Sequence, residues 1–154
     1  MTLPSRTRRL FLSIALLALG GIAYGGYFAI QGMLGRKALE ETQLVSLPLA
    51  DSLERAGREG KLVLVDVAAI WCPTCRRLDR EVLAHPDVRR RITADFVFSR
   101  LEYDSTEGRA FHDRVGAAGF PTLWLVAPDG AVVKRLELTF EPRAFLAQLE
   151  SPRP

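Results

Sequence analysis

The sequence predicts an α/β fold in which helices flank a central mixed β-sheet, preceded by one N-terminal transmembrane helix. Residues 62–67 form an apolar, valine-rich run, which is typical of a strand buried on both faces of a sheet. Residues 10–30 form a stretch of 21 residues without a charge. Strand-like and helix-like segments then follow in the order β-α-β-α-β-β-α, which favours a sheet covered by helices. A chain of 154 residues allows one such domain and an appendage.

The N-terminal segment has the length and the flanking charges of a membrane anchor. At about 1.5 Å per residue, a helix over residues 10–30 spans the roughly 30 Å of a hydrocarbon core. The basic residues that flank this stretch are Arg6, Arg8, Arg9, Arg36 and Lys37. The three early arginines favour a cytoplasmic tail over residues 1–9 and place the bulk of the chain on the far side of the membrane.

Two other interpretations of residues 10–30 stay open. The first is a cleaved signal peptide, with the small residues Ala23 and Gly25 framing a possible cut. An apolar stretch of 21 residues is long for the core of a signal peptide, which favours an uncleaved anchor. The second is a helix buried in a soluble core, and the four glycines of the stretch argue against it. With either an anchor or a signal peptide, the domain is exported.

Charge and cysteine content narrow the function classes. All 18 acidic residues and 18 of the 21 basic residues lie at or beyond position 36. The exported part therefore has no net formal charge and gives no electrostatic reason to expect nucleic acid as a partner. Both cysteines lie in one motif, so the sequence indicates no disulfide framework.

The elements around the motif follow from periodicity and turn residues. Residues 31–48 are predicted to be a linker, helical at first and with an edge strand at residues 42–47, that leads into a domain over residues 49–151. Asp51 or Ser52 can cap a short helix that Gly60 ends. Further segments are helices at residues 76–84, after a cap at Asp87, at 106–115 and from 142, and strands at residues 96–101, 122–126 and 131–138.

A pair of cysteines stands at the end of the first predicted strand. The strand leads to Trp71 and then to Cys72-Pro73-Thr74-Cys75, which opens a polar, helix-prone segment. Two thiols at this spacing can close a small disulfide ring, and the exposed N–H groups and the dipole of a helix start favour a thiolate. Pro73 suits the first helical turn, where its missing N–H would have had no partner. The pattern predicts a redox site.

Three separated features together resemble the thioredoxin-fold family, over about residues 50–150. The first is the Trp71–Cys75 motif at a strand–helix junction. The second is Asp66, six residues before the first cysteine, where the family keeps a buried acid. The third is Phe120-Pro121-Thr122, where the family has its cis-proline loop. A CxxC motif alone is a weak signal, whereas all three at these spacings are specific.

Within that family, residues 49–88 most resemble the C-terminal domain of the DsbD thiol–disulfide interchange proteins. The Cys-Pro-Thr-Cys-Arg string also resembles the membrane-anchored thioredoxins of cytochrome c maturation. Only 45 residues separate Cys75 from Pro121, so the central insertion of those thioredoxins is missing.

The resemblance implies roles for the residues that match. Cys72 would be the attacking thiolate, and Cys75 would resolve the mixed disulfide, leaving a Cys72–Cys75 redox disulfide. Asp66 would be a buried base for Cys75, and the alternative is a strand-end acid that faces solvent. Arg100 stands where thioredoxins often carry a lysine. Pairing with Arg100 would hold Asp66 ionised and weaken it as a base.

The resemblance also implies a docking surface for a partner protein. The Phe120–Pro121 bond is expected to be cis, with Phe120 offering its backbone N–H and C=O to an extended partner segment. Trp71 would shield the disulfide and form an apolar rim. The alternative for Pro121 is an ordinary trans proline of an edge strand.

The cysteine pair has two less reactive interpretations, a static disulfide or half of a metal site. We expect no metal and no cofactor, because His85 and His112 lie at no recognisable metal-ligand spacing from the cysteines. Covalent haem is excluded, since Arg76 rather than histidine follows Cys75.

The sequence thus leads to the expectation of a single-pass inner-membrane thiol–disulfide oxidoreductase with its catalytic domain in the periplasm. Its partners would be disulfide-containing exported proteins, which it reduces, and a membrane electron donor of the DsbD type. Two alternatives stay open: a thiol oxidase or isomerase, and a tethered adaptor or chaperone that binds partners in the Trp71–Phe120 groove with little redox turnover.

Overall fold

The structure, a computed structural model, describes the backbone of residues 5–150 and the side chains from residue 10 onward. The expected cytoplasmic tail over residues 1–9 therefore lies outside the described residues, apart from the backbone of residues 5–9. The last residue of the expected domain, residue 151, also lies outside them.

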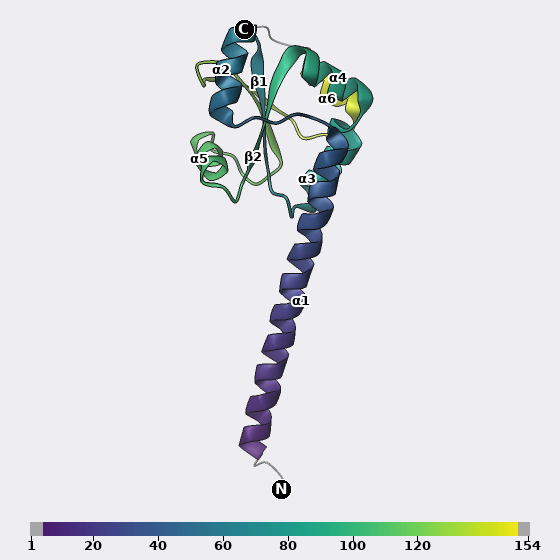
Figure 1. The fold of residues 1–154 in the computed structure, drawn as a ribbon, viewed down its shortest axis with the longest axis vertical. Helices are drawn as coiled ribbons and strands as arrows, with labels where there is room; N and C mark the ends of the chain where they lie inside the picture. The colour runs from purple at the N-terminus through teal and green to yellow at the C-terminus, as the bar shows by residue number, and fades with distance from the viewer. Residues whose placement is uncertain (1–4, 151–154) are drawn as a thin grey trace.

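The fold is a four-stranded mixed sheet with helices on both faces, which confirms the predicted class (Figure 1). The helices are α1 (Ser5–Thr42), α2 (Leu49–Glu59), α3 (Pro73–Leu78), the π-helical turn η1 (Asp79–Leu83), α4 (Pro86–Asp95), α5 (Thr106–Arg114) and α6 (Pro142–Gln148). The strands are β1 (Leu62–Ala68), β2 (Phe96–Glu102), β3 (Thr122–Val126) and β4 (Val132–Leu136). The strand order is β2-β1-β3-β4, with β1 parallel to β2 and the other pairs antiparallel.

Strand β1 is buried along its whole length because each of its faces carries a separate core. Leu62 and Leu64 pack on one face with apolar side chains of α3, η1, α4 and α6. Val63 and Val65 pack on the other face with side chains of α2 and α5, and Trp124 belongs to this second core. Alternate residues of a strand point to opposite faces, so one apolar run supplies both cores.

The edge strand expected at residues 42–47 is absent. Thr42 instead ends α1, where its hydroxyl donates to the Leu39 carbonyl and accepts from the Leu44 N–H. The segment then runs beside β2 and makes one backbone bond to it, from the Leu47 N–H to the Phe98 carbonyl. The Arg100 N–H goes to the Ser46 side chain and not to its backbone, so no ladder forms.

Two predicted helix caps differ from the observed ones. Helix α2 begins at Leu49, after Pro48, and neither Asp51 nor Ser52 is its N-cap. The predicted end is confirmed, because Gly60 caps α2 in the left-handed conformation, with φ of 62°.

Helix α4 is capped by His85 and not by Asp87. The His85 Nδ1 accepts the Asp87 N–H at 3.3 Å, and Pro86 takes the first helical position. The helix expected at residues 76–84 is divided into α3 and the π-helical η1.

Helix α1 is one continuous helix of 38 residues that extends from the domain as a single rod (Figure 1). Its segment Leu10–Thr42 is long and apolar enough to cross a membrane, by length and composition. Its C-terminal part does not stand clear of the domain but packs against α3 and η1.

Candidate active site

Cys72 is the N-cap of α3, so its sulfur lies among the unpaired N–H groups of the first helical turn. Its Sγ accepts the Cys75 N–H at 3.1 Å. The Cys75 thiol and the N–H groups of Cys75 and Thr74 lower the pKa of Cys72 to about 6, against the opposing effect of its burial. Cys72 is 6% exposed, and both cysteines are free thiols. The Cys72 sulfur is therefore mostly thiolate at neutral pH.

Cys75 lies one turn into α3 and is fully buried. Its hydrogen bond to Cys72, its burial and the charge of Asp66 raise the pKa of Cys75 far above the ordinary value. The two thiols are thus strongly differentiated: the pKa of Cys72 is lowered, and the pKa of Cys75 is raised.

A cluster of four charged residues extends from β1 and β2 to the start of η1, and the charge of Asp66 in it acts on the Cys75 thiol. Nη1 of Arg100 lies 3.0 Å from Oδ2 of Asp66 and 2.8 Å from Oδ1 of Asp79. Nε of Arg100 lies 3.1 Å from Oε1 of Glu102. Asp66 and Asp79 are 0% and 1% exposed. Two buried carboxyl groups therefore share a single guanidinium.

Burial and this sharing both act on the pKa of Asp66. Burial raises the pKa of Asp66 to about 7, the nearby Asp79 adds to the rise, and Arg100 only partly opposes it. Burial raises the pKa of Asp79 as well. The second oxygens, Oδ1 of Asp66 and Oδ2 of Asp79, have no hydrogen-bond partner within the described part of the chain. The pairing with Arg100 expected from the sequence forms, and the pKa of Asp66 is nevertheless raised because burial outweighs the effect of the guanidinium.

An aromatic rim surrounds the thiol pair. The rings of Trp71 and Phe120 meet edge to face with centroids 5.4 Å apart, and Tyr103 lies 4.9 Å from Phe120. The Phe120–Pro121 peptide bond is cis. Nε1 of Trp71 donates to Oδ2 of Asp104 at 2.7 Å. The structure thus brings the expected Trp71, Phe120 and Pro121 to the same end of the sheet as the thiols, and their role in binding a partner stays a prediction.

Sequence reasoning missed several residues that support this site. Tyr103 and Asp104 follow β2, and Glu102 accepts the N–H of Ile70 in the loop before the cysteines. Because β1 and β2 are parallel, their carboxyl ends meet at one edge of the sheet. The predicted β-α-β order could therefore have indicated that residues following β2 lie near the cysteine motif. The position of Asp79 near the site could also have been predicted, because Asp79 stands four residues after Cys75 and thus on the same face of a helix.

His112 supports the rim from α5. Its Nε2 lies 3.2 Å from the carbonyl oxygen of Gly119, directly before the cis-proline loop. Its ring meets that of Tyr103 edge to face, with centroids 5.0 Å apart. His112 and His85 are thus both engaged with the fold, one at this loop and the other at the start of α4.

Comparisons with known sequences agree with this geometry. A family model described as a thioredoxin-like domain matches residues 49–151, the part that carries the thiols, the charged cluster and the rim. The thiol:disulfide interchange protein DsbD 1 of Pseudomonas aeruginosa is 36% identical over 83 residues, which are 51% of this chain and 14% of that protein. The chain therefore spans a small part of this much longer relative.

Two solved structures are similar to the domain. A thioredoxin from Thermus thermophilus has a TM-score of 0.60 at 34% identity, over 69% of this chain and 84% of that one. The oxidised C-terminal domain of DsbD from Neisseria meningitidis has a TM-score of 0.56 at 22% identity, over 69% of this chain and 97% of that one, and supports the fold alone.

Proposed function

The chain belongs to the thioredoxin-like family as a thiol–disulfide oxidoreductase-like domain related to DsbD, and from that membership we propose that it is a membrane-anchored reductase of exported proteins. Its N-terminus would lie in the cytoplasm and its catalytic domain in the periplasm. The observation that supports the chemistry best is the Cys72 sulfur at the N-cap of α3, hydrogen-bonded to the Cys75 N–H.

The first step is an attack by the Cys72 thiolate on a disulfide of the partner. A bond forms between Sγ of Cys72 and one partner sulfur, and the partner's second sulfur leaves as a thiolate that takes up a proton. The pKa of Cys72, about 6, keeps the nucleophile charged without a separate base.

The second step releases the reduced partner. Cys75 loses its proton and attacks Sγ of Cys72, which closes the Cys72–Cys75 disulfide and expels the partner's first sulfur as a thiolate. Two electrons have then passed to the partner. A dithiol donor in the membrane, of the DsbD type, would return the pair to the reduced state and be oxidised in turn.

Asp66 is the group we assign to accept the proton of Cys75. It is buried, its charge acts on the Cys75 thiol, and its pKa of about 7 suits proton transfer at neutral pH. Arg100 and Asp79 are positioning residues, because they act on the protonation of Asp66 and do not contact the sulfurs in any hydrogen bond or ion pair that the described residues show.

The partner would dock as an extended segment against the backbone of Phe120, beside the cis-proline bond. The rings of Trp71 and Phe120 would cover its apolar side chains and keep water from the mixed disulfide. No pocket for a small molecule is required, since the substrate is a disulfide carried on another protein.

Insulin reduction coupled to dithiothreitol tests the proposal. Cys72→Ser should abolish the activity, and Cys75→Ala should trap the partner as a mixed disulfide on Cys72 in cells. Val133→Ala, on the exposed part of β4, is the control and should leave the rate unchanged. Partner capture that survives Cys72→Ser would instead support a tethered adaptor. Faster oxidation of a reduced substrate than reduction of an oxidised one would support a thiol oxidase.

A further inference from the structure

The apolar stretch of α1 leads into the domain without a spacer. Residues 10–27 are exposed, and the uncharged part of the helix continues to Gly35, directly before Arg36. Among the described side chains of α1, the first buried residue is Gly32, which lies inside this uncharged stretch. At about 1.5 Å per residue the exposed stretch matches the roughly 30 Å of a hydrocarbon core. A membrane that covers this stretch would therefore reach the part of the domain that packs against α1, at α3 and η1.

A line of small residues fixes α1 against the loop that carries the active site. Gly32, Gly35 and Ala38 are buried on one face of the helix. A Cβ at Gly35 would lie 1.8 Å from the carbonyl oxygen of Ile70, so only glycine allows this approach. Ile70 is the residue directly before Trp71.

Two polar contacts hold the same face of α1 against α3 and η1. Nη1 of Arg76 donates to Oε1 of Gln31 at 2.6 Å, and Nε of Arg80 lies 2.9 Å from Oε2 of Glu41. Arg76 directly follows the second cysteine, so α1 is bound to both ends of the active-site motif. The direction of the site relative to the apolar stretch is therefore set by packing and not by a flexible linker.

The rim of the active site touches the apolar stretch itself. The Phe28 ring packs edge to face on Trp71 with centroids 5.7 Å apart. Tyr24 and Tyr27 pack on Phe28, with centroids 4.8 and 5.6 Å away. Tyrosine and tryptophan at the end of an apolar span are typical of the membrane–water interface.

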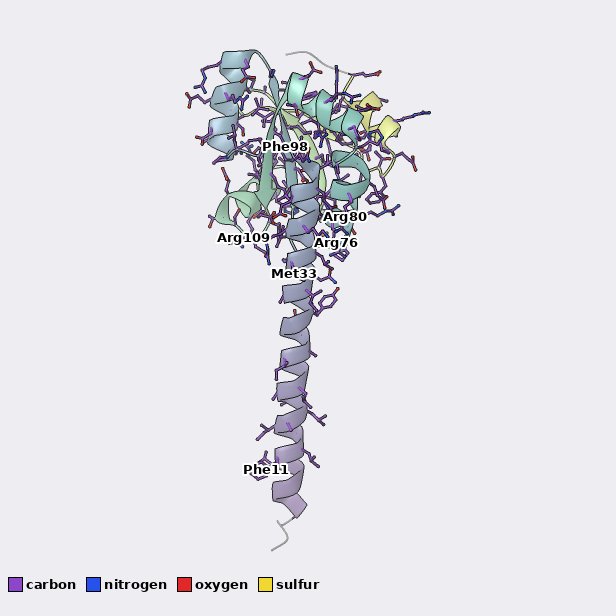
Figure 2. The ribbon with its side chains drawn as sticks, turned by 45° about the vertical axis from the view of Figure 1, so that its right-hand side comes forward. Phe11, Met33, Arg76, Arg80, Phe98 and Arg109 are labelled. Atoms are coloured by element: carbon purple, nitrogen blue, oxygen red, sulfur yellow. The ribbon has the colours of Figure 1, made fainter. Side chains whose placement is uncertain are left out.

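Basic side chains lie at the same level of the molecule. Figure 2 shows Arg76 and Arg109 on the side of the domain nearest the N-terminal part of α1, close to the level of Met33 on the helix. Arg36 and Lys37 are exposed on α1 itself. Such residues favour contact with anionic headgroups.

We infer that α1 holds the active-site end of the domain on the bilayer surface, with the Trp71 ring in the lipid headgroup layer. The exchange partner would then be a cysteine pair that is presented at the membrane surface. This inference rests on the proposed membrane anchor, and it adds the orientation that the anchor imposes.

The two tryptophans of the chain allow a direct test. Trp124→Phe leaves Trp71 as the fluorophore, and the matched variant Trp71→Phe leaves Trp124, which is 7% exposed in the core. The full chain is reconstituted, with reduced thiols, into vesicles of phosphatidylcholine and phosphatidylglycerol that carry nitroxide-labelled headgroups. The quencher should lower the fluorescence of Trp71 about twofold or more and leave that of Trp124 nearly unchanged, as expected for an interfacial ring.

A glycine pair supplies a second test in the Trp124→Phe background. Gly35→Leu should force α1 away from the Ile70 carbonyl and reduce the quenching of Trp71. Gly25→Leu is the matched control, since a Cβ there meets nothing within 4 Å, and it should leave the quenching unchanged.

Vesicle flotation and insulin reduction separate the possible failures. Absence of Trp71 quenching in protein that floats with the vesicles overturns the orientation and leaves the anchor intact. Protein that does not float overturns both the anchor and the orientation. Absence of insulin reduction by the same chain in detergent micelles, where no bilayer covers the site, refutes the proposed reductase chemistry, and quenching of Trp71 in vesicles then leaves the orientation standing.

Discussion

Replacing Asp66 with asparagine should make the protein more stable at high pH than the wild type. The change keeps the shape of the side chain and leaves Arg100 paired with Asp79 alone. It removes the carboxyl group whose pKa is raised from 3.8 to about 7 by burial. Because the folded protein holds this proton more tightly than the unfolded chain, the contribution of Asp66 to stability is fully present below pH 3.8 and is lost as pH rises to about 7.

The size of the stability difference follows from the part of the pH range between 3.8 and about 7 that an experiment can cover. Between pH 5 and pH 8 the wild type loses about two pKa units of linkage, or about 3 kcal/mol, that Asp66→Asn keeps. Cys72 acts in the opposite direction, because its pKa of about 6 is lowered and its contribution to stability is lost as pH falls through 6. That contribution is common to both proteins and cancels in their difference.

Urea unfolding of the reduced full chain in detergent micelles measures this difference, with tryptophan fluorescence as a probe of the domain. Asp95→Asn, at a side chain that is 44% exposed, is the control and should differ from the wild type equally at both pH values. A difference for Asp66→Asn that does not grow with pH would refute the reasoning. Asp66 would then be held ionised by Arg100, as the sequence alone suggested.

The same substitution should slow the resolving step, because Asn cannot accept the proton of Cys75. Loss of a general base commonly costs about 10²- to 10⁴-fold in rate. The lifetime of the mixed disulfide on Cys72, followed by quenched-flow and gel analysis, should increase, while the initial attack by Cys72 keeps its rate. An unchanged lifetime would remove Asp66 from the mechanism.

The thiol, the rim and the end of α2 can each be tested in isolation. The rate of Cys72 alkylation by iodoacetamide should rise with pH, with a midpoint near pH 6. Cys75→Ala should move this midpoint upward, because it removes the Cys75 thiol, whose hydrogen bond lowers the pKa of Cys72 the most. An unchanged midpoint would contradict this. Asp104→Ala removes the acceptor of the Trp71 N–H and should raise KM for a protein disulfide about fivefold, the equivalent of about 1 kcal/mol, with Cys72 alkylation unchanged. Gly60→Ala should cost about 1 kcal/mol in urea unfolding because φ is 62°, and no loss would mean that the cap relaxes.

Local signals in the sequence were sufficient for the elements that position the thiols. The apolar run that became β1 needed only its valine-rich composition, because a strand buried on both faces has no polar side. Pro73 and the two cysteines marked the start of α3, and Gly60 marked the end of α2. Each of these depends on backbone preferences within a few residues.

Other features depended on contacts between distant parts of the chain. Asp104 reaches Trp71 only because β1 and β2 are parallel and end at the same edge of the sheet. The failed edge strand at residues 42–47 has a similar cause, since only the packed structure shows that a side chain takes the Arg100 N–H.

The sequence by itself determined the fold class and the position of the cysteine pair at a strand–helix junction, because periodicity, turn residues and spacing are read along the chain. Only the tertiary structure decided the direction in which the pKa of Asp66 is shifted, which depends on burial and on the second acid, Asp79, that shares Arg100. It alone also placed α1 against Ile70 and Trp71. Burial and electrostatic coupling sum over neighbours in space, and the linear order of residues does not specify those neighbours.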